Sequence, residues 1–291
     1  MTPAAAASSL ELEERLLTHE GGQIRYLIGG TGPAMLLCHG FIGSAENFDD
    51  WLPALVTRRT VIAPDLPGFG KSAPLRGRHT AAALARAAVA AADHAGAVEY
   101  DVAGLCLGSS VAMAVQRLRP ASARRVVLHT PLLHPGLVRR HFHVQVGVMT
   151  APGVWPAIVW LGRQRIVSDL YKRVVVEGPD VDPVAAQVNF ENQMRADMRA
   201  SREWLRDGLG CDELALVRTG GRRTLILMAR DDRVLDVPRI VRTLGRERHV
   251  ELAVIDGGGH AWTDAMRAVQ STSIASFLDD QPLTTEDTEA A

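Results

Sequence analysis

The amino-acid sequence predicts an α/β fold: a mostly parallel sheet covered by helices on both faces, with an inserted helical cap. Two observations predict it. Strand-like and helix-like segments alternate almost from end to end, which is typical of parallel sheets built from strand and helix units. The alternation is interrupted once, from about Pro131 to Asp212, where helical periodicity and several prolines replace the strand signals.

The composition is that of a globular protein, and it excludes several kinds of partner. The 291 residues are 47% hydrophobic, which allows a large core. A net charge of -1, with no long basic stretch, argues against nucleic-acid binding and against attraction to anionic membranes. Three cysteines without a CxxC pair argue against a disulfide framework or a cysteine zinc site. We therefore expect a cytoplasmic protein that binds no metal.

The first half of the chain predicts a hairpin followed by repeating strand and helix units. Glu20-Gly21-Gly22 supplies the hairpin turn, and Pro120 ends the last helix of this half because proline cannot continue a helix. Short apolar runs bounded by turn residues predict buried strands. The predicted strands are Leu10–Thr18, Gln23–Gly29, Ala34–Cys38, Thr60–Ala63, Val98–Ala103 and Arg125–His129, and the predicted helices are Ala45–Arg58, Ala81–His94 and Cys106–Arg119.

The second half begins with the predicted cap and then returns to strand and helix units. The 19 uncharged residues from Val144 to Gly162 are near the lower limit for a membrane span, but Pro152, Gly153 and Pro156 interrupt them. We expect two short apolar cap helices there and no stable membrane insertion. The predicted strands after the cap are Thr224–Met228 and His249–Ile255, and the predicted helices are Val237–Gly245 and Trp262–Leu278.

These segments divide the chain into one core and one insertion. We predict an α/β core over residues 10–130 and 213–280 and a helical cap over 131–212. The polar ends lack an apolar period, so we expect a disordered amino terminus over residues 1–9 and a mobile acidic tail over 281–291. The sequence leaves the oligomeric state open.

Cys106 has the sequence setting of a nucleophile. It is the central residue of Gly104-Leu105-Cys106-Leu107-Gly108, between an apolar strand-like run and a helix-like run. A sharp turn from strand to helix exposes the central side chain, and the flanking glycines allow the backbone to make that turn. By contrast, we interpret Cys38 and Cys211 as small apolar core residues.

Other polar residues follow the predicted strands, where ligand sites of open α/β sheets lie. Asp231-Asp232 follows the strand that ends near Met228, and His260 follows the last strand after three glycines. The chain order is therefore nucleophile, acid, histidine, an order that differs from those of other triad folds.

At these positions the chain resembles the α/β-hydrolase family, in a variant with a cysteine nucleophile. The resemblance extends from His39 to the closing helix, and the family's habitual segments occur in order. They are His39-Gly40-Phe41, the loop of residues 65–72, the G-x-C-x-G elbow at 104–108, Asp232-Arg233-Val234 and Gly259-His260.

The resemblance implies a role for each site residue. Cys106 would be the nucleophile and His260 the general base, with Asp232 fixing the histidine tautomer. Asp232 matches the family position better than Asp231. The backbone amides of Phe41 and Leu107 would form the oxyanion hole.

A thiol nucleophile leaves three functions open. The first is a hydrolase that acts on an ester, lactone or thioester through an acyl-Cys106 intermediate. The second is an acyltransferase or cyclase that uses a carrier-bound or coenzyme-A-bound acyl chain, and the third is a non-enzymatic receptor for a small ligand. In each case the partner is a small molecule, and Trp155 and Trp160 of the cap are candidate substrate contacts.

No cofactor is predicted. Gly68–Ser72 ends in Gly-Lys-Ser like a phosphate-binding loop, but Asp65 stands where that motif requires its first glycine. The elbow also lacks the G-x-G-x-x-G pattern of a dinucleotide site.

Overall fold

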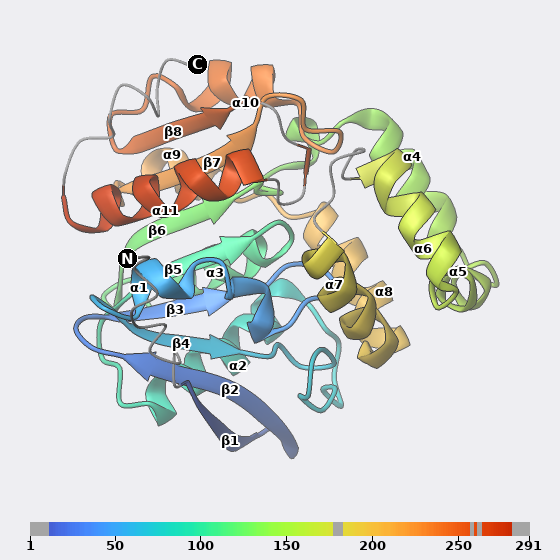
Figure 1. Ribbon diagram of the computed structural model, residues 1–291, viewed down its shortest axis with the longest axis horizontal. Helices are drawn as coiled ribbons and strands as arrows, with labels where there is room; N and C mark the ends of the chain where they lie inside the picture. The colour runs from blue at the N-terminus through green and yellow to red at the C-terminus, as the bar shows by residue number, and fades with distance from the viewer. Residues whose placement is uncertain (1–11, 177–182, 257–258, 261–263, 281–291) are drawn as a thin grey trace, which may run out of the picture.

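One eight-stranded sheet organises the part of the chain that the computed structural model describes, residues 12–176, 183–256, 259–260 and 264–280 (Figure 1). The strand order is β1-β2-β4-β3-β5-β6-β7-β8. β1 pairs antiparallel with β2, and β2 pairs antiparallel with β4, while the remaining neighbours are parallel. The mostly parallel sheet is therefore confirmed. The strands are Glu13–His19 (β1), Gly22–Gly30 (β2), Ala34–Cys38 (β3), Thr60–Pro64 (β4), Tyr100–Leu105 (β5), Ala123–His129 (β6), Thr224–Ala229 (β7) and Val250–Ile255 (β8).

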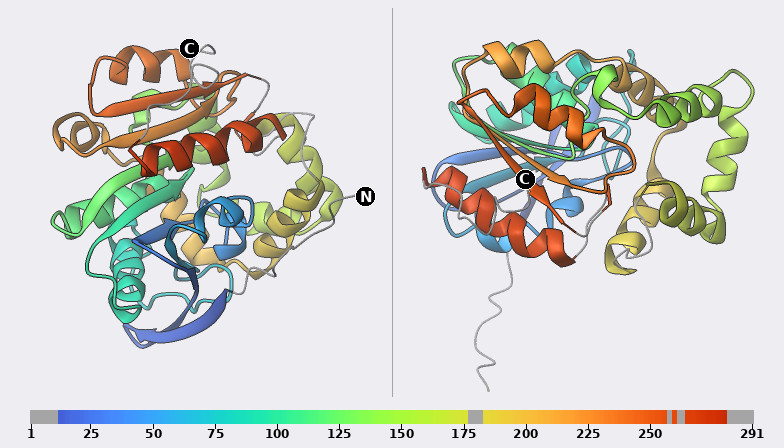
Figure 2. Two further views of the ribbon diagram at one scale, coloured as in Figure 1. Left: turned by 60° about the vertical axis from the view of Figure 1, so that its left-hand side comes forward. Right: turned by 90° about the horizontal axis from the view of Figure 1, so that it is seen from above.

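The apolar strands bury both of their faces. In β3, Leu36 and Cys38 belong to one core cluster, whereas Met35 and Leu37 belong to the other, as the two-residue period of a strand requires. Helices α2, α3 and α10 pack on the first face, and η1, α1 and α11 pack on the second (Figure 2). These helices are η1 (Ala45–Phe48), α1 (Leu52–Leu55), α2 (Ala81–His94), α3 (Gly108–Leu118), α10 (Val237–Leu244) and α11 (Asp264–Leu278).

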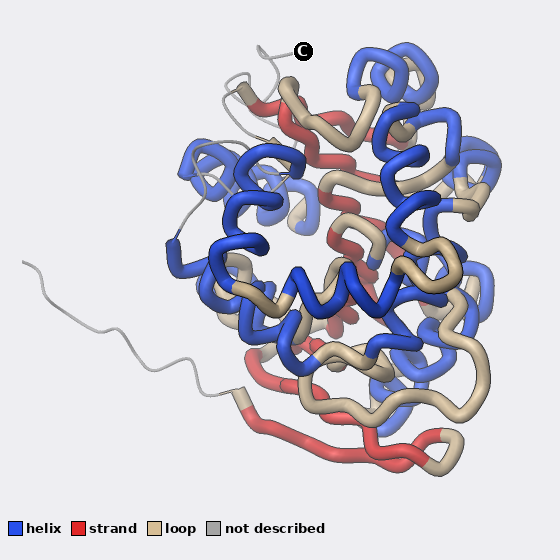
Figure 3. Tube along the Cα trace, turned by 90° about the vertical axis from the view of Figure 1, so that its right-hand side faces the viewer, coloured by secondary structure: helices blue, strands red, loops and turns tan. Residues whose placement is uncertain are grey.

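The helices over residues 140–209, between β6 and β7, lie beyond the carboxyl ends of the parallel strands (Figures 1 and 3). Trp204 of α8 is fully buried, and its ring centroid lies 5.1 Å from that of Phe69 in the core. The backbone amide of Asp197 also donates to the Gly68 carbonyl, so this region is joined to the sheet by packing and by backbone contacts. The helices are η2 (Pro135–Leu137), α4 (Arg140–Met149), α5 (Trp155–Gly162), α6 (Arg165–Tyr171), the π-helical turn η3 (Lys172–Val176), α7 (Pro183–Arg195), α8 (Met198–Leu209) and α9 (Leu214–Thr219).

Three of the differences between the predicted elements and the structure have a physical explanation in particular residues. The single helix expected over Ala45–Arg58 is instead two short helices, because Pro53 lacks an amide hydrogen and sits in the first turn of α1. The strand expected from Val98 begins at Tyr100, since Val98 is 81% exposed and pairing with β3 starts at Tyr100. The helix expected from Cys106 begins at Gly108, because Cys106 has a positive φ that a right-handed helix excludes.

The uncharged run from Val144 to Gly162 is divided between α4 and α5, with Gly153 at φ +80° in the loop between them. Within the described ranges, no helix combines the length and the apolar character needed to cross a bilayer. The predicted disordered segment 1–9, the predicted tail 281–291 and Trp262 lie outside the described residues.

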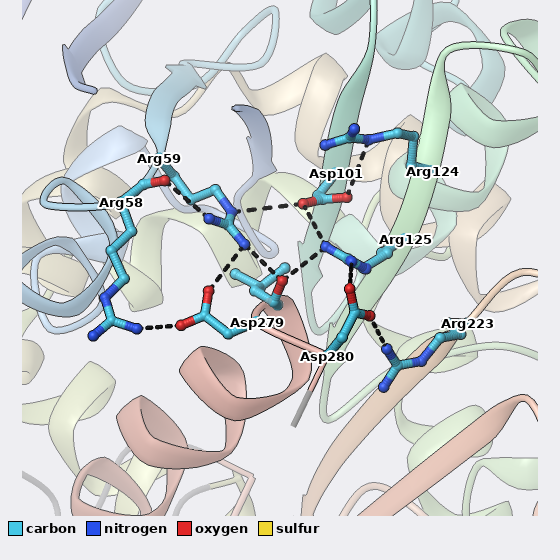
Figure 4. Close-up of polar contacts among 9 residues, drawn as sticks. Arg58, Arg59, Asp101, Arg124, Arg125, Arg223, Asp279 and Asp280 are labelled. Atoms are coloured by element: carbon cyan, nitrogen blue, oxygen red, sulfur yellow. Dashed lines mark hydrogen bonds and ion pairs between the residues drawn. The ribbon is translucent and has the colours of Figure 1, made fainter. Parts of the chain in front are cut away.

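A cluster of arginines and aspartates holds the carboxyl end of α11 (Figure 4). The guanidinium groups of Arg59 and Arg125 both donate to the Leu278 carbonyl, at 2.7 and 2.8 Å. Both also lie near the fully buried carboxylate of Asp101, at 3.7 and 3.8 Å. Cations at a helix carboxyl end interact favourably with the helix dipole, so this cluster fixes α11 against the sheet.

We predict that Arg59→Met lowers the free energy of unfolding by about 3 kcal/mol, because the change removes a charge from a buried ion-pair cluster. Arg58→Met is the matched control: Arg58 pairs with Asp279, but its side chain is 60% exposed, so its loss should cost under about 1 kcal/mol. Urea unfolding of the three proteins measures both values. Equal losses of unfolding free energy from the two variants would contradict the role of Arg59 in holding α11 against the sheet.

Candidate active site

Cys106 lies at a strained turn between β5 and α3. Its φ is +51°, in the left-handed region that non-glycine residues rarely adopt. Its backbone amide donates to the carbonyl of His129 at 2.8 Å, which ties the turn to the end of β6. The flanking glycines explain how the turn packs. A Cβ on Gly104 would lie 2.6 Å from the Gly108 carbonyl oxygen, and a Cβ on Gly108 would lie 2.3 Å from that of His39.

The loop after β7 presents Asp232 to the site. Its side chain is fully buried, whereas Asp231 is exposed. One carboxylate oxygen, Oδ1, accepts backbone hydrogen bonds from Val234 at 2.7 Å and Leu235 at 2.8 Å. The other oxygen is left to face the histidine, so the loop orients the carboxylate for one partner.

His260 joins Asp232 to Cys106. Its Nδ1 lies 2.9 Å from Asp232 Oδ2, and its Nε2 lies 3.0 Å from Cys106 Sγ. Because a carboxylate only accepts hydrogen bonds, Nδ1 carries a proton and Nε2 faces the sulfur. The thiol, the imidazole and the carboxylate, which are far apart in the sequence, are therefore in contact through His260.

Burial and charge oppose each other in this pair. Burial favours the neutral form of His260, but the charges of Asp232 and Cys106 outweigh it, and the pKa of His260 is raised well above its ordinary value. Burial likewise favours the neutral form of Asp232, but the His260 charge and the backbone donors outweigh it, and the pKa of Asp232 is lowered. Both groups therefore favour their charged forms in the folded protein.

The early loop after β3 packs directly against the elbow. A Cβ on Gly40 would lie 3.3 Å from Cys106 Cβ, so this glycine permits a close approach. His39 fixes the loop: its Nδ1 donates to the Gly40 carbonyl at 2.8 Å, and its Nε2 accepts from the Leu66 amide at 2.9 Å. Phe41 and Leu107 both line the cavity beside Cys106, and within the described residues neither backbone amide has a hydrogen-bond acceptor.

A cavity of about 550 Å³ opens above Cys106, with residues of the core on one side and of α4 to α8 on the other. Trp155 lines it, is 6% exposed, and donates from Nε1 to the Met198 carbonyl at 2.8 Å. Trp160 is 63% exposed and lies outside the lining, because it is on the outer side of α5. The apolar lining residues are Phe41, Ile42, Leu105, Leu107, Leu132, Phe142, Val146, Met149, Trp155, Ile158, Val159, Leu161, Val167, Ala196, Met198, Leu205 and Val234.

The sequence pattern of the alpha/beta hydrolase fold matches residues 33–262. The chain belongs to the α/β-hydrolase family.

Known members of this α/β-hydrolase family resemble the chain to different extents. The 2-hydroxymuconate semialdehyde hydrolase of Pseudomonas putida is 28% identical over 251 residues, covering 83% of this chain and 82% of the relative. Pyrrolizixenacetamide deacetylase of Xenorhabdus hominickii is 37% identical over 107 residues, covering 36% of this chain and 40% of the relative. The solved structure of N-acyl homoserine lactonase AidH has a TM-score of 0.75 and 18% identity, and the match covers 94% of this chain and 98% of that chain. This last likeness shows the shared fold.

Two site residues of this α/β hydrolase were missed by the sequence reasoning. His129 is the last residue of β6 and Thr130 follows it, and both line the cavity beside Cys106. Burial, and next the charge of His260, lower the pKa of His129 to about 3, so its ring is neutral at physiological pH. Thr130 has φ +43°, a strained value for a β-branched residue. The signal available in the sequence was their position at the carboxyl end of a predicted buried strand.

We predict that the stabilising effect of the Asp232–His260 pair depends on pH. The lowered pKa of Asp232 gives stability that is present above the ordinary aspartate pKa and is lost as pH falls through the folded-state value. The raised pKa of His260 gives stability that is present below the ordinary histidine pKa and is lost as pH rises through the folded-state value. Asp232→Asn should therefore cost most between about pH 4 and 6.5.

Asparagine retains an oxygen that can accept from Val234 and Leu235, so this variant keeps those backbone contacts and removes the charge and the acceptor that face His260. Urea unfolding of both proteins at about pH 3, 6 and 10 measures the difference in unfolding free energy. A difference that stays constant over this range would contradict the charged pair.

Proposed function

We propose that the protein is a hydrolase that cleaves an ester, lactone or thioester through an acyl-Cys106 intermediate. The observation that carries the proposal is the contact of Cys106 Sγ with His260 Nε2 at 3.0 Å, backed by Asp232 at 2.9 Å from Nδ1. A thiol becomes a strong nucleophile when an adjacent imidazole takes its proton. Asp232 holds the imidazole in the tautomer that can do so.

In the acylation step, His260 Nε2 already holds the proton of the Cys106 thiol, as its raised pKa favours, and the sulfur attacks the substrate carbonyl carbon. The carbonyl oxygen becomes an oxyanion beside the backbone amides of Phe41 and Leu107, which supply hydrogen-bond donors. His260 then gives the proton to the leaving alcohol or thiol as the carbon–oxygen or carbon–sulfur bond breaks. The product of this step is a thioester on Cys106.

In the hydrolysis step, a water molecule attacks the thioester carbonyl while His260 takes one of its protons. The carbon–sulfur bond breaks, the acid leaves, and the proton returns to Cys106. The mainly apolar lining of the cavity supports an acyl group as the part of the substrate that is buried. The hydrolase and the deacetylase among the relatives agree with hydrolysis as the outcome.

Cys106 should carry the acyl group, and this is the direct test of the proposal. Intact-mass measurement after mixing with p-nitrophenyl esters or acyl thioesters should detect a transient adduct on the wild type and none on Cys106→Ala. Cys211→Ala is the matched control: burial raises the pKa of the Cys211 thiol to about 12, so its removal should leave the adduct intact. An adduct that persisted on Cys106→Ala would overturn the proposed nucleophile.

His260→Ala should slow acylation by about 10²–10⁴-fold, because general base catalysis typically contributes that much. Stopped-flow release of p-nitrophenolate in single turnovers measures the rate. His141→Ala, an exposed histidine of α4, is the control and should acylate at the wild-type rate. If His260→Ala matched that rate, His260 would not be the base.

The same reagents separate hydrolysis from the alternative functions. A transferase would divert most of the acyl group to a low concentration of added alcohol, amine or thiol, whereas a hydrolase would release the free acid. A receptor would bind a small apolar ligand without turnover, and its binding would not respond to His260→Ala. Product analysis by mass spectrometry distinguishes these outcomes.

A further inference from the structure

The side of the cavity formed by α4, α6 and α7 carries a group of polar side chains. Most are uncharged, unlike a surface built to hold only an alkyl chain. They come from three helices, and several hydrogen bond to one another. The uncharged members are Gln145 of α4, Ser168 and Tyr171 of α6, and Asn189 and Gln193 of α7.

Two of these contacts use conventional donors and acceptors. Ser168 Oγ donates to Gln193 Oε1 at 3.2 Å, and Asn189 Oδ1 accepts from Asn47 Nδ2 at 3.0 Å. These two contacts brace the cavity wall, since each of them joins two protein side chains.

Tyr171 differs from them. Its hydroxyl oxygen accepts from Gln145 Nε2 at 2.8 Å, so the hydroxyl proton must find another acceptor. The acceptor within reach is the thioether sulfur of Met149 at 3.8 Å, which is a weak one. Burial raises the pKa of Tyr171 to about 12, so the hydroxyl keeps this proton at physiological pH.

Gln145 adds a second donor at the same place. Its side-chain amide has two N–H bonds, and one is used on the Tyr171 hydroxyl. A carbonyl oxygen has two lone pairs and can accept from an O–H and an N–H together. The chemistry of this corner therefore fits one carbonyl oxygen of a ligand in the cavity.

We propose that Tyr171, with Gln145, binds a carbonyl oxygen on the acyl chain of the substrate, away from the carbonyl that Cys106 attacks. The substrate class is thus an oxo- or amide-bearing acyl ester, lactone or thioester. This inference rests on the proposed function, because that function supplies the other carbonyl, the one that Cys106 attacks. Tyr171 acts as a specificity-determining residue, because a site with a buried hydrogen-bond donor discriminates against an analogue that cannot accept from it.

The test uses matched pairs of p-nitrophenyl esters. In one member a ketone stands at a chosen carbon of the acyl chain, and in the other a methylidene group replaces the ketone oxygen at that carbon. The ketone position is moved along the chain, and kcat/KM is measured for each pair. We expect a preference for the ketone of about tenfold at the favoured position, the size of a buried hydrogen bond.

Tyr171→Phe should reduce that preference to under about threefold, measured as the ratio of kcat/KM within each ester pair, because one of the two donors is lost. Tyr26→Phe is the matched control: the Tyr26 hydroxyl contacts His94 at 2.8 Å outside the cavity, so the ketone preference should stay. Gln145→Met is a second variant that removes the adjacent donor, and it should weaken the preference in the same direction. A preference under about threefold at every position, or one that Tyr171→Phe leaves unchanged, would overturn the inference.

Binding to Cys106→Ala makes the test independent of turnover. Isothermal titration calorimetry with the same ester pairs should give a Kd about tenfold lower for the ketone at the favoured position. Selective binding without turnover by the wild type would reject the proposed function and retain the Tyr171 assignment. Turnover of both esters without selectivity would retain the proposed function and reject the Tyr171 assignment.

Discussion

The site depends on one strained backbone turn, at Cys106. A left-handed conformation at a cysteine costs about 1–3 kcal/mol, so the surroundings must hold it. They do so through a fully buried strand before the turn, through the hydrogen bond from Cys106 to the His129 carbonyl, and through glycines where neighbouring backbone leaves no room for a Cβ. The turn directs the sulfur into the cavity, where the loops after β7 and β8 supply its partners.

The three cysteines show how surroundings determine the chemistry of one side chain. Burial raises the pKa of Cys38 and of Cys211 to about 12, so both stay protonated and inert. Cys106 instead lies 3.0 Å from the imidazole of His260, in a partly exposed position. The reactivity that we propose for Cys106 would therefore come from the elbow and from the Asp232 loop, which together place one imidazole beside this sulfur.

The features that could be predicted from the sequence are those that a local residue pattern determines. Short apolar runs bounded by turn residues identified the buried strands, and glycines around Cys106 identified the turn, because strand burial and tight turns restrict residue type directly. The break in the helix at Pro53 was visible in the sequence but was not used. The exposure of Trp160 and the inward position of Tyr171 could not be predicted, because the orientation of each cap helix depends on packing against distant residues such as Trp204.

The charge of Cys106 also links the two halves of the proposed reaction. Burial opposes the charged form of His260, and the charges of Asp232 and Cys106 together overcome it. In the proposed reaction, acylation would convert the sulfur into a neutral thioester and remove the charge of Cys106, which would lower the pKa of His260. A neutral imidazole is the form that can accept a proton from water. Formation of the acyl intermediate would therefore favour the neutral form of His260 that hydrolysis of the intermediate needs. Asp232 would hold the imidazole ring in position throughout.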